Sequence, residues 1–258
     1  MANGERALDG ALHFSDREDV REKLFKRVWT QELNDVFADV AKYYDRANYV
    51  ASLGLWNKFR NSFLATIELQ SGQRALDVCA GTNAVGIAML RKQPDLKVCA
   101  MDRSAAMQEV GRQLAEKEGF HIESVIGDVH KLPFPDNHFD VVTLQWASRH
   151  LRVMDVYQEI RRVLKPGGHF YHCDMLRPGS KLVERAYYAY LRVSLSVTAV
   201  LFQSGATARN CKKYFIDALS LFYSAEEMSQ LLRHLVYENV SSKTLMGGMI
   251  GFHKAMKP

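Results

Sequence analysis

Three aspartates stand at the ends of three successive apolar segments, a placement that suits the binding of a nucleoside. Asp77 closes the first segment, Asp102 follows the second, and Asp128 follows the third. If the segments are parallel strands, Asp102 can accept hydrogen bonds from both hydroxyls of a ribose, and Asp128 can meet the amino group of an adenine. Gly81 would let the backbone approach such a ligand closely. The pattern favours an adenosine pocket, although acids in these places also cap loops and helix starts.

The aspartates are positioned by short apolar segments that alternate with helical patterns, as in a parallel sheet covered on both faces. Ser104 suits the N-cap of one helix, and the run KPGG at residues 165–168 stops another. Two later apolar segments, joined across Gly247 and Gly248, predict a hairpin. Seven strands are therefore expected, over residues 74–79, 96–101, 122–127, 139–145, 169–173, 240–245 and 249–255. The predicted fold class is α/β, with a doubly wound, mostly parallel seven-stranded sheet.

Helical patterns flank this core on both sides. Residues 18–44 carry apolar side chains at helical spacing, residues 56–67 repeat the pattern, and residues 180–202 form a long helical stretch. Residues 1–17 show only weak periodicity and are expected to lack regular structure. Four parts are predicted: an N-terminal helical cap over residues 1–70, a ligand-binding core over 71–178, a helical lid over 179–224, and a C-terminal helix with the hairpin, over 225–258, that completes the sheet.

Composition and charge exclude several classes of protein. Hydrophobic residues make up 47% of the 258 residues and charged residues 24%, which is usual for a globular chain, and no uncharged apolar run is long enough to span a membrane. The net charge of +5 comes without a basic stripe or a base-flipping motif, so no nucleic-acid partner is expected. The motif GxGxxG and a phosphate-binding lysine are missing, which argues against NAD or ATP. Four cysteines without CxxC spacing and a polar N-terminus indicate the reducing cytoplasm.

At this point the sequence resembles a known family. A likeness to class I S-adenosylmethionine (SAM) methyltransferases is carried by the runs LDVCAGT, MDRS, GDVHKLPFPDNHFDVV and RRVLKPGG. A narrower likeness, to the ubiquinone/menaquinone C-methyltransferase (UbiE-like) family, is carried by VAKYYDRANYVASLGLWNKFR, the Arg149-His150 pair, the segment 213–222 and the closing GGMIGFH. It extends from about Val40 to His253. The resemblance implies a Rossmann-like core that binds SAM, and a polyprenyl quinone as the substrate.

The resemblance also implies roles for individual residues. The residues expected to bind SAM are Tyr44, Asp77, Cys79, Gly81, Thr82, Asn83, Asp102, Arg103, Asp128, Val129 and Gln145. Tyr43, Tyr44 and Asp45 belong to an N-terminal motif that closes over the cofactor. Arg149 is expected to stabilise negative charge on a ring oxygen, and His150, which titrates near neutrality, is the candidate base. A purely structural, hydrogen-bonded His150 is the alternative.

The chain departs from the family where the first strand turns into the next helix. The family usually reads CGTGD there, whereas this chain has Asn83 in place of the last glycine and Ala84 in place of the acid. Asparagine can adopt a left-handed turn, so the fold should survive. Because this turn cradles the methionine end of SAM, we expect a repositioned amino-acid tail. On the substrate side, Ala218 lacks a family hydroxyl and Tyr223 replaces a proline.

Two interpretations of these departures remain open. The favoured one is the rhodoquinone-biosynthesis (RquA-like) branch, whose members resemble UbiE proteins with an altered SAM motif and are understood to use SAM as the amino donor that replaces a methoxy group of ubiquinone. The alternative is C-methylation of a demethylated ubiquinone or menaquinone precursor. The favoured branch also implies a divalent metal such as manganese. His172 and Asp174 could share one strand face, but two ligands are too few, so no metal residues are assigned.

The long helical stretch at residues 180–202 offers an apolar surface for a polyprenyl tail and for a membrane interface. We therefore expect a cytoplasmic protein with peripheral contact on the inner face of the membrane. A homodimer is left open by the sequence. A non-catalytic assembly partner in a quinone complex, in which Asn83 and Ala84 would reflect decay, is the competing class.

Overall fold

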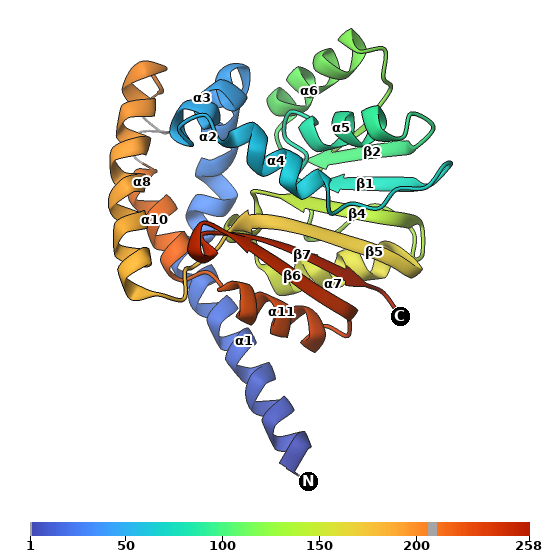
Figure 1. Ribbon diagram of the computed structural model, residues 1–258, viewed down its shortest axis with the longest axis vertical. Helices are drawn as coiled ribbons and strands as arrows, with labels where there is room; N and C mark the ends of the chain where they lie inside the picture. The colour runs from blue at the N-terminus through green and yellow to red at the C-terminus, as the bar shows by residue number, and fades with distance from the viewer. Residues whose placement is uncertain (1, 206–210) are drawn as a thin grey trace.

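A sheet of seven strands lies at the centre of the part of the chain that the structure describes (Figure 1). This structure, a computed structural model, describes residues 2–205 and 211–258, with side chains from Phe14 onward. The strand order is β3-β2-β1-β4-β5-β7-β6, and β7 runs antiparallel to both of its neighbours while the other pairs are parallel. The strands are β1 Arg74–Val78, β2 Lys97–Asp102, β3 Glu123–Ile126, β4 Phe139–Gln145, β5 Leu164–Met175, β6 Glu238–Leu245 and β7 Ile250–Met256.

Helices cover both faces of this sheet, as the alternating pattern predicts. On one face lie α7 Val153–Val163 and α11 Ala225–His234. On the other lie α4 Trp56–Leu64, α5 Ala84–Lys92 and α6 Ala105–Lys117. The fold class predicted from the sequence is therefore confirmed.

Strand β1 shows how a continuous apolar run serves two cores. Leu76 and Val78 pack on one face in the same core cluster as Val156 of α7. Ala75 points to the opposite face and belongs to the cluster that contains Phe63 of α4. All three strand residues are fully buried. A central parallel strand needs apolar side chains on both faces, which is why its sequence does not alternate.

A second group of helices stands beyond the carboxyl ends of the parallel strands (Figure 1). It comprises α1 Ala2–Arg27, α2 Leu33–Val40, α3 Tyr44–Ala51, α8 Lys181–Leu201 and α10 Lys212–Ser220. Helix α8 contacts both α3 and α10. Among the described residues, no helix is long and apolar enough to cross a membrane. These helices cover the edge of the sheet at which ligands bind in doubly wound folds.

Two local predictions differ from the structure. Residues 2–17, expected to lack regular structure, form the first part of α1, because the helix is anchored by buried charged residues, Glu18 and Arg21, which an apolar pattern does not reveal. The strand expected over residues 169–173 is longer and includes the KPGG run, since Gly167 and Gly168 pair with Lys257. Residues 206–210 of the predicted lid, and Met1 of the predicted cap, lie outside the described residues.

Candidate active site

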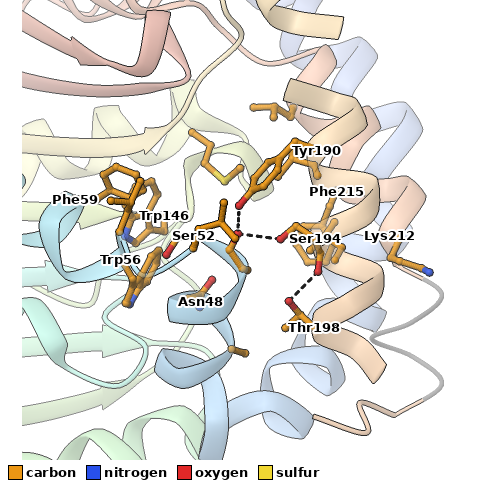
Figure 2. Close-up of a pocket in the computed structure, with 18 of the residues that line it drawn as sticks. Asn48, Ser52, Trp56, Phe59, Trp146, Tyr190, Ser194, Thr198, Lys212 and Phe215 are labelled. Carbon is orange, nitrogen blue, oxygen red and sulfur yellow. Dashed lines mark hydrogen bonds between the residues drawn. The ribbon is translucent and has the colours of Figure 1, made fainter. Parts of the chain in front are cut away.

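Two cavities open side by side above the strand ends, within the described part of the chain. The first, of about 340 Å³, borders the ends of β1, β2 and β4, and we call it the strand-end cavity. The second, of about 500 Å³, lies among α2, α3, α8 and α10, and we call it the helical cavity (Figure 2). Four aromatic residues line both cavities and form their common wall, Phe37, Tyr44, Trp56 and Trp146. A ligand in one cavity therefore comes close to a ligand in the other at this wall.

The strand-end cavity gathers nearly all of the residues predicted to bind SAM. Those that line it are Tyr44, Asp77, Cys79, Gly81, Thr82, Asp102, Arg103, Asp128, Val129 and Gln145. His150 lines it as well, whereas Arg149 lines the helical cavity. Asn83 lines neither. The parallel register brings these side chains together, because β1 pairs with both β2 and β4.

Asp102 combines a structural role with room for a ligand. Its carboxylate accepts hydrogen bonds from the backbone N–H of Gly81, at 2.9 Å, and of Ser104, at 2.8 Å. It thus fixes the turn after β1 and the start of α6, whose N-cap is Ser104, as expected. Each carboxylate oxygen can accept more than one hydrogen bond, so acceptor capacity remains for a ribose. The geometry is therefore compatible with a role of Asp102 in binding a nucleoside and with a role in capping the turn and the helix start.

Asp77 sits deeper and is largely cut off from solvent. One carboxylate oxygen accepts a hydrogen bond from Thr143 Oγ1 at 2.7 Å, and the other has no partner among the described residues. Burial raises the pKa of Asp77 to about 7. The side chain lines the strand-end cavity, where its second oxygen could accept a hydrogen bond from a ligand.

The predicted role of the Asn83 side chain needs correction. Asn83 does adopt the left-handed conformation, with φ of +58°. Its side chain, however, turns under α6, where its oxygen accepts a hydrogen bond from Gln108 Nε2 at 2.9 Å. A Cβ at Gly111 would lie 2.7 Å from it, so the fit beneath the helix is tight. The Asn83 side chain therefore stabilises the turn without lining the strand-end cavity. Of the two differences from the family pattern, Ala84 is the one that lines this cavity.

A carboxylate from the N-terminal helices stands over this turn. Asp45 of α3 accepts hydrogen bonds from Thr82 Oγ1 and from the indole N–H of Trp56, each at 3.1 Å. Arg60 lies 3.8 Å from it. The N-terminal motif predicted to close over the cofactor thus reaches the strand-end cavity, and it places a negative charge beside Ala84, where the family pattern has its own acid.

His150 is held by a chain of two hydrogen bonds. The indole N–H of Trp29 donates to the Tyr214 hydroxyl at 2.8 Å, which leaves the hydroxyl hydrogen for His150 Nδ1 at 2.7 Å. If the Tyr214 hydroxyl donates to Nδ1, the imidazole hydrogen lies on Nε2, which has no partner among the residues described. Burial, together with the nearby Arg149 and Arg21 charges, lowers the pKa of His150 well below its usual value. The lowered pKa keeps the imidazole neutral in this structure, and the base role of His150 stays a prediction.

Arg149 offers a positive charge to the helical cavity. It pairs with the buried Asp174 of β5 and donates to the carbonyl oxygen of Trp146 at 2.9 Å. Burial raises the pKa of Tyr44, in the wall beside it, to about 12, so that hydroxyl stays neutral. His172, two residues before Asp174, lies instead in the core against His253, with 3.2 Å between their Nδ1 atoms. His172 and Asp174 therefore do not converge on a common ligand.

The helical cavity is lined mainly by apolar side chains, and α8 forms one long wall of it with Tyr187, Leu191 and Leu195. The opposite wall comes from α3 and α4, as Figure 2 shows for Asn48, Trp56 and their neighbours. Such a shape suits an elongated apolar ligand whose polar end lies at the common wall. As to metals, no group of three or more His, Cys, Asp or Glu side chains within the described residues is arranged to hold an ion.

Comparison with known proteins agrees with this geometry. Residues 25–257 match the model of the ubiE/COQ5 methyltransferase family. The chain is 32% identical to the ubiquinone/menaquinone biosynthesis C-methyltransferase UbiE of Pseudomonas putida, over 88% of this chain and 90% of that one. It is 30% identical to the mitochondrial 2-methoxy-6-polyprenyl-1,4-benzoquinol methylase of Caenorhabditis elegans, over 88% of this chain and 80% of that one.

Solved structures show the same fold. The Haemonchus contortus phosphoethanolamine N-methyltransferase 2 in complex with SAM superposes with a TM-score of 0.57 at 15% identity, over 80% of this chain and 53% of that one. A SAM-dependent methyltransferase from Aquifex aeolicus gives a TM-score of 0.52 at 18% identity, over 77% and 89%. The sheet is that of class I SAM methyltransferases, and the family model covers most of the sequence. The chain belongs to the ubiE/COQ5 methyltransferase family and is a SAM-dependent enzyme of that family.

Proposed function

We propose that this enzyme transfers a methyl group from SAM to a ring carbon of a prenylated quinol. The observation that carries the proposal is the common wall between the two cavities, because it brings a cofactor site and an apolar, elongated site together at one point. SAM supplies an electrophilic methyl group on its sulfonium. The relatives reported above act on quinone rings by their names, which supports the same class of substrate.

The residues of the strand-end cavity fit SAM. Asp102 has acceptor capacity for the ribose hydroxyls, and Asp128, two residues after β3 and in the lining of the same cavity, would accept from the adenine amino group. Asp45 and Thr82 lie where the methionine end would be held, and the carboxylate of Asp45 can pair with an ammonium. The aromatic faces of the common wall are suited to a sulfonium cation.

At the ring, the enzyme must favour an ionised hydroxyl, because a phenolate pushes electrons to the ring carbon that attacks the methyl group. Arg149, a largely buried residue in the wall of the helical cavity with 12% of its side chain exposed, would stabilise such a negative charge. His150, whose Nε2 has no partner among the described residues, lines the strand-end cavity and would be a second polar contact for the ring. In the net step a C–C bond forms and the S–CH3 bond of the sulfonium breaks, with its electron pair remaining on sulfur in S-adenosylhomocysteine. The methylated ring carbon then releases its proton to water, and the ring becomes aromatic again.

The polyprenyl tail would occupy the helical cavity, and α8 would rest on the membrane that stores such a substrate. The helix exposes Leu182, Val193, Val197 and Val200 to solvent, with exposed fractions between 47% and 80%. Arg192 is exposed beside them. An apolar ridge with basic neighbours and without exposed acids suits the interface of an anionic bilayer.

A vesicle experiment tests the membrane contact. Substituting Val193→Ser and Val200→Ser together should reduce co-sedimentation with vesicles that contain anionic lipid. The matched control is Leu114→Ser with Ile126→Ser, which removes exposed apolar side chains from other elements. Equal co-sedimentation of both double variants would refute the placement.

The second candidate is the replacement of a methoxy group by an amino group, which the sequence analysis favours. One observation supports it. Ala84 lines the strand-end cavity with a methyl group at the position where the family pattern has an acid, so the amino end of SAM lacks that charged partner. The similar proteins are methyltransferases by name, and Asn83 does not itself reshape the cavity, so we rank C-methylation first.

One incubation separates the two candidates. The enzyme is mixed with SAM and either a reduced demethylated prenyl quinol or ubiquinone, and the product mass is read. We expect a gain of one CH2 unit on the demethylated quinol. Replacement of methoxy by amino on ubiquinone, with no methylated product, would establish the second candidate instead, and no product from either ring would refute both.

A further inference from the structure

Trp146 has an unusual backbone conformation for a bulky residue. It follows the last residue of β4 and has φ of +61°, in the left-handed region that large side chains avoid. The conformation is held from both sides, because the backbone N–H of Trp146 donates to the Cys173 carbonyl at 2.8 Å and its own carbonyl accepts from Arg149. Strain of this kind persists where the surrounding structure requires it, and it concentrates at functional sites. Its effect here is to point an indole into the common wall of the two cavities.

The indole N–H of Trp146 is a buried donor without a partner in the described residues. The side chain is only 8% exposed. Its neighbour Trp56 stacks on it with 5.1 Å between ring centroids (Figure 2). The N–H of Trp56 is bonded to Asp45. A buried tryptophan N–H usually finds a partner, and leaving one unpaired destabilises the fold. An acceptor on a bound ligand would relieve this cost.

Two hydroxyls of the helical cavity are already engaged within the protein. Ser194 donates to the carbonyl oxygen of Ala51 at 2.9 Å, and Thr198 donates to that of Ser194 at 2.8 Å, both dashed in Figure 2. These hydroxyls also lie along α8, in the part of the cavity suited to a tail. At the common wall, by contrast, the N–H of Trp146 is unpaired, and Arg149, which also lines the helical cavity, donates to the Trp146 carbonyl.

We propose that the Nε1–H of Trp146 donates a hydrogen bond to one ring oxygen of the substrate and so determines which ring carbon faces the methyl donor. This inference rests on the proposed function, since it takes a dihydroxylated ring as the ligand of the common wall. Trp146 would thereby be a specificity-determining residue that contacts the substrate. Its strained backbone and its unpaired donor then have the same cause.

The test is equilibrium binding to the full-length enzyme saturated with S-adenosylhomocysteine, which has no methyl group to transfer, measured by calorimetry. The probes are a short-chain 2-methoxy-6-alkyl-1,4-benzoquinol and its two monohydroxy counterparts, each lacking one ring hydroxyl. The variant Trp146→Phe keeps an aromatic ring and removes the donor. A second variant, in which Trp146 is replaced by benzothienylalanine, keeps both fused rings and exchanges only N–H for sulfur. Trp56→Phe is the matched control, because its N–H is bonded to Asp45.

We expect both Trp146 variants to bind the benzoquinol about tenfold more weakly than the parent, with SAM affinity unchanged. One monohydroxy probe should bind the parent and the variants equally, because the oxygen that the indole would meet is already missing. Trp56→Phe should show no such dependence on the probe. Equal losses for all three probes, or a loss of SAM affinity instead, would overturn the inference while leaving the proposed function intact. No binding of the benzoquinol to the parent would refute the proposed function, and this inference with it.

Discussion

Replacing Asp102 by asparagine should weaken SAM binding without unfolding the enzyme. Asparagine keeps one oxygen that can accept from Gly81 or Ser104, so most of the local structure survives. What is lost is the charge-assisted hydrogen bonding to the ribose hydroxyls. A hydrogen bond to a charged group contributes about 1.5–3 kcal/mol, which corresponds to roughly a 10- to 150-fold change in the dissociation constant.

Calorimetric titration with SAM measures this change directly. The matched control is Asp140→Asn, because Asp140 also accepts a backbone hydrogen bond at a strand, from Arg74 N at 2.9 Å, but lines neither cavity. Both variants should unfold at similar temperatures, and only Asp102→Asn should lose affinity. An Asp102→Asn variant that binds SAM as tightly as the parent would refute the assignment of the strand-end cavity to the adenosine.

Three further changes probe the packing and the buried charges. Gly111→Ala should lower the free energy of unfolding by about 1–3 kcal/mol and weaken SAM binding, because its Cβ would lie 2.7 Å from the Asn83 side chain; unchanged denaturation and binding curves would contradict this. Burial raises the pKa of Asp77 to about 7, so between about pH 4 and 7 the native state keeps a proton that the unfolded chain loses. The free energy of unfolding should therefore fall as the pH rises through this range. Asp77→Asn should reduce that fall in urea titrations at several pH values. Glu18→Gln leaves a buried guanidinium without its counter-charge and should cost about 3–5 kcal/mol in the same assay, against less than about 1 kcal/mol for the exposed Lys26→Gln.

Much of the fold follows from patterns that are local in the sequence. The apolar segment of β4 has the bounds that the sequence predicts, Phe139–Gln145, because a central strand is a continuous apolar run between polar residues. The N-cap at Ser104 follows from its own residue type. The start of α1 could not be predicted, since its fully buried anchors, Glu18 and Arg21, are charged. They pair with each other and make further hydrogen bonds to backbone groups more than a hundred residues away.

The candidate site also has residues that the sequence predicts and residues whose role appears only in the structure. The acids at the strand ends could be assigned because parallel strands bring consecutive carboxyl ends to one edge of the sheet. The direction of the Asn83 side chain depends on the space beside Gly111, which no local pattern reports. Trp146 was missed because an aromatic residue after an apolar strand is typical of core packing. Its place between β4 and the Arg149-His150 pair was the available signal, and its unpaired N–H appears only in three dimensions.

The central claim, that SAM gives its methyl group to the ring, is tested most directly by following its atoms. The enzyme is incubated with a reduced demethylated prenyl quinol and SAM that carries heavy carbon in its methyl group and heavy nitrogen in its amino group, and the lipid product is analysed by mass spectrometry. The account predicts a ring product with the heavy carbon and without the heavy nitrogen, formed in equal amount with S-adenosylhomocysteine. Heavy nitrogen on the ring, or a ring that gains neither label while the enzyme binds both ligands, would contradict it.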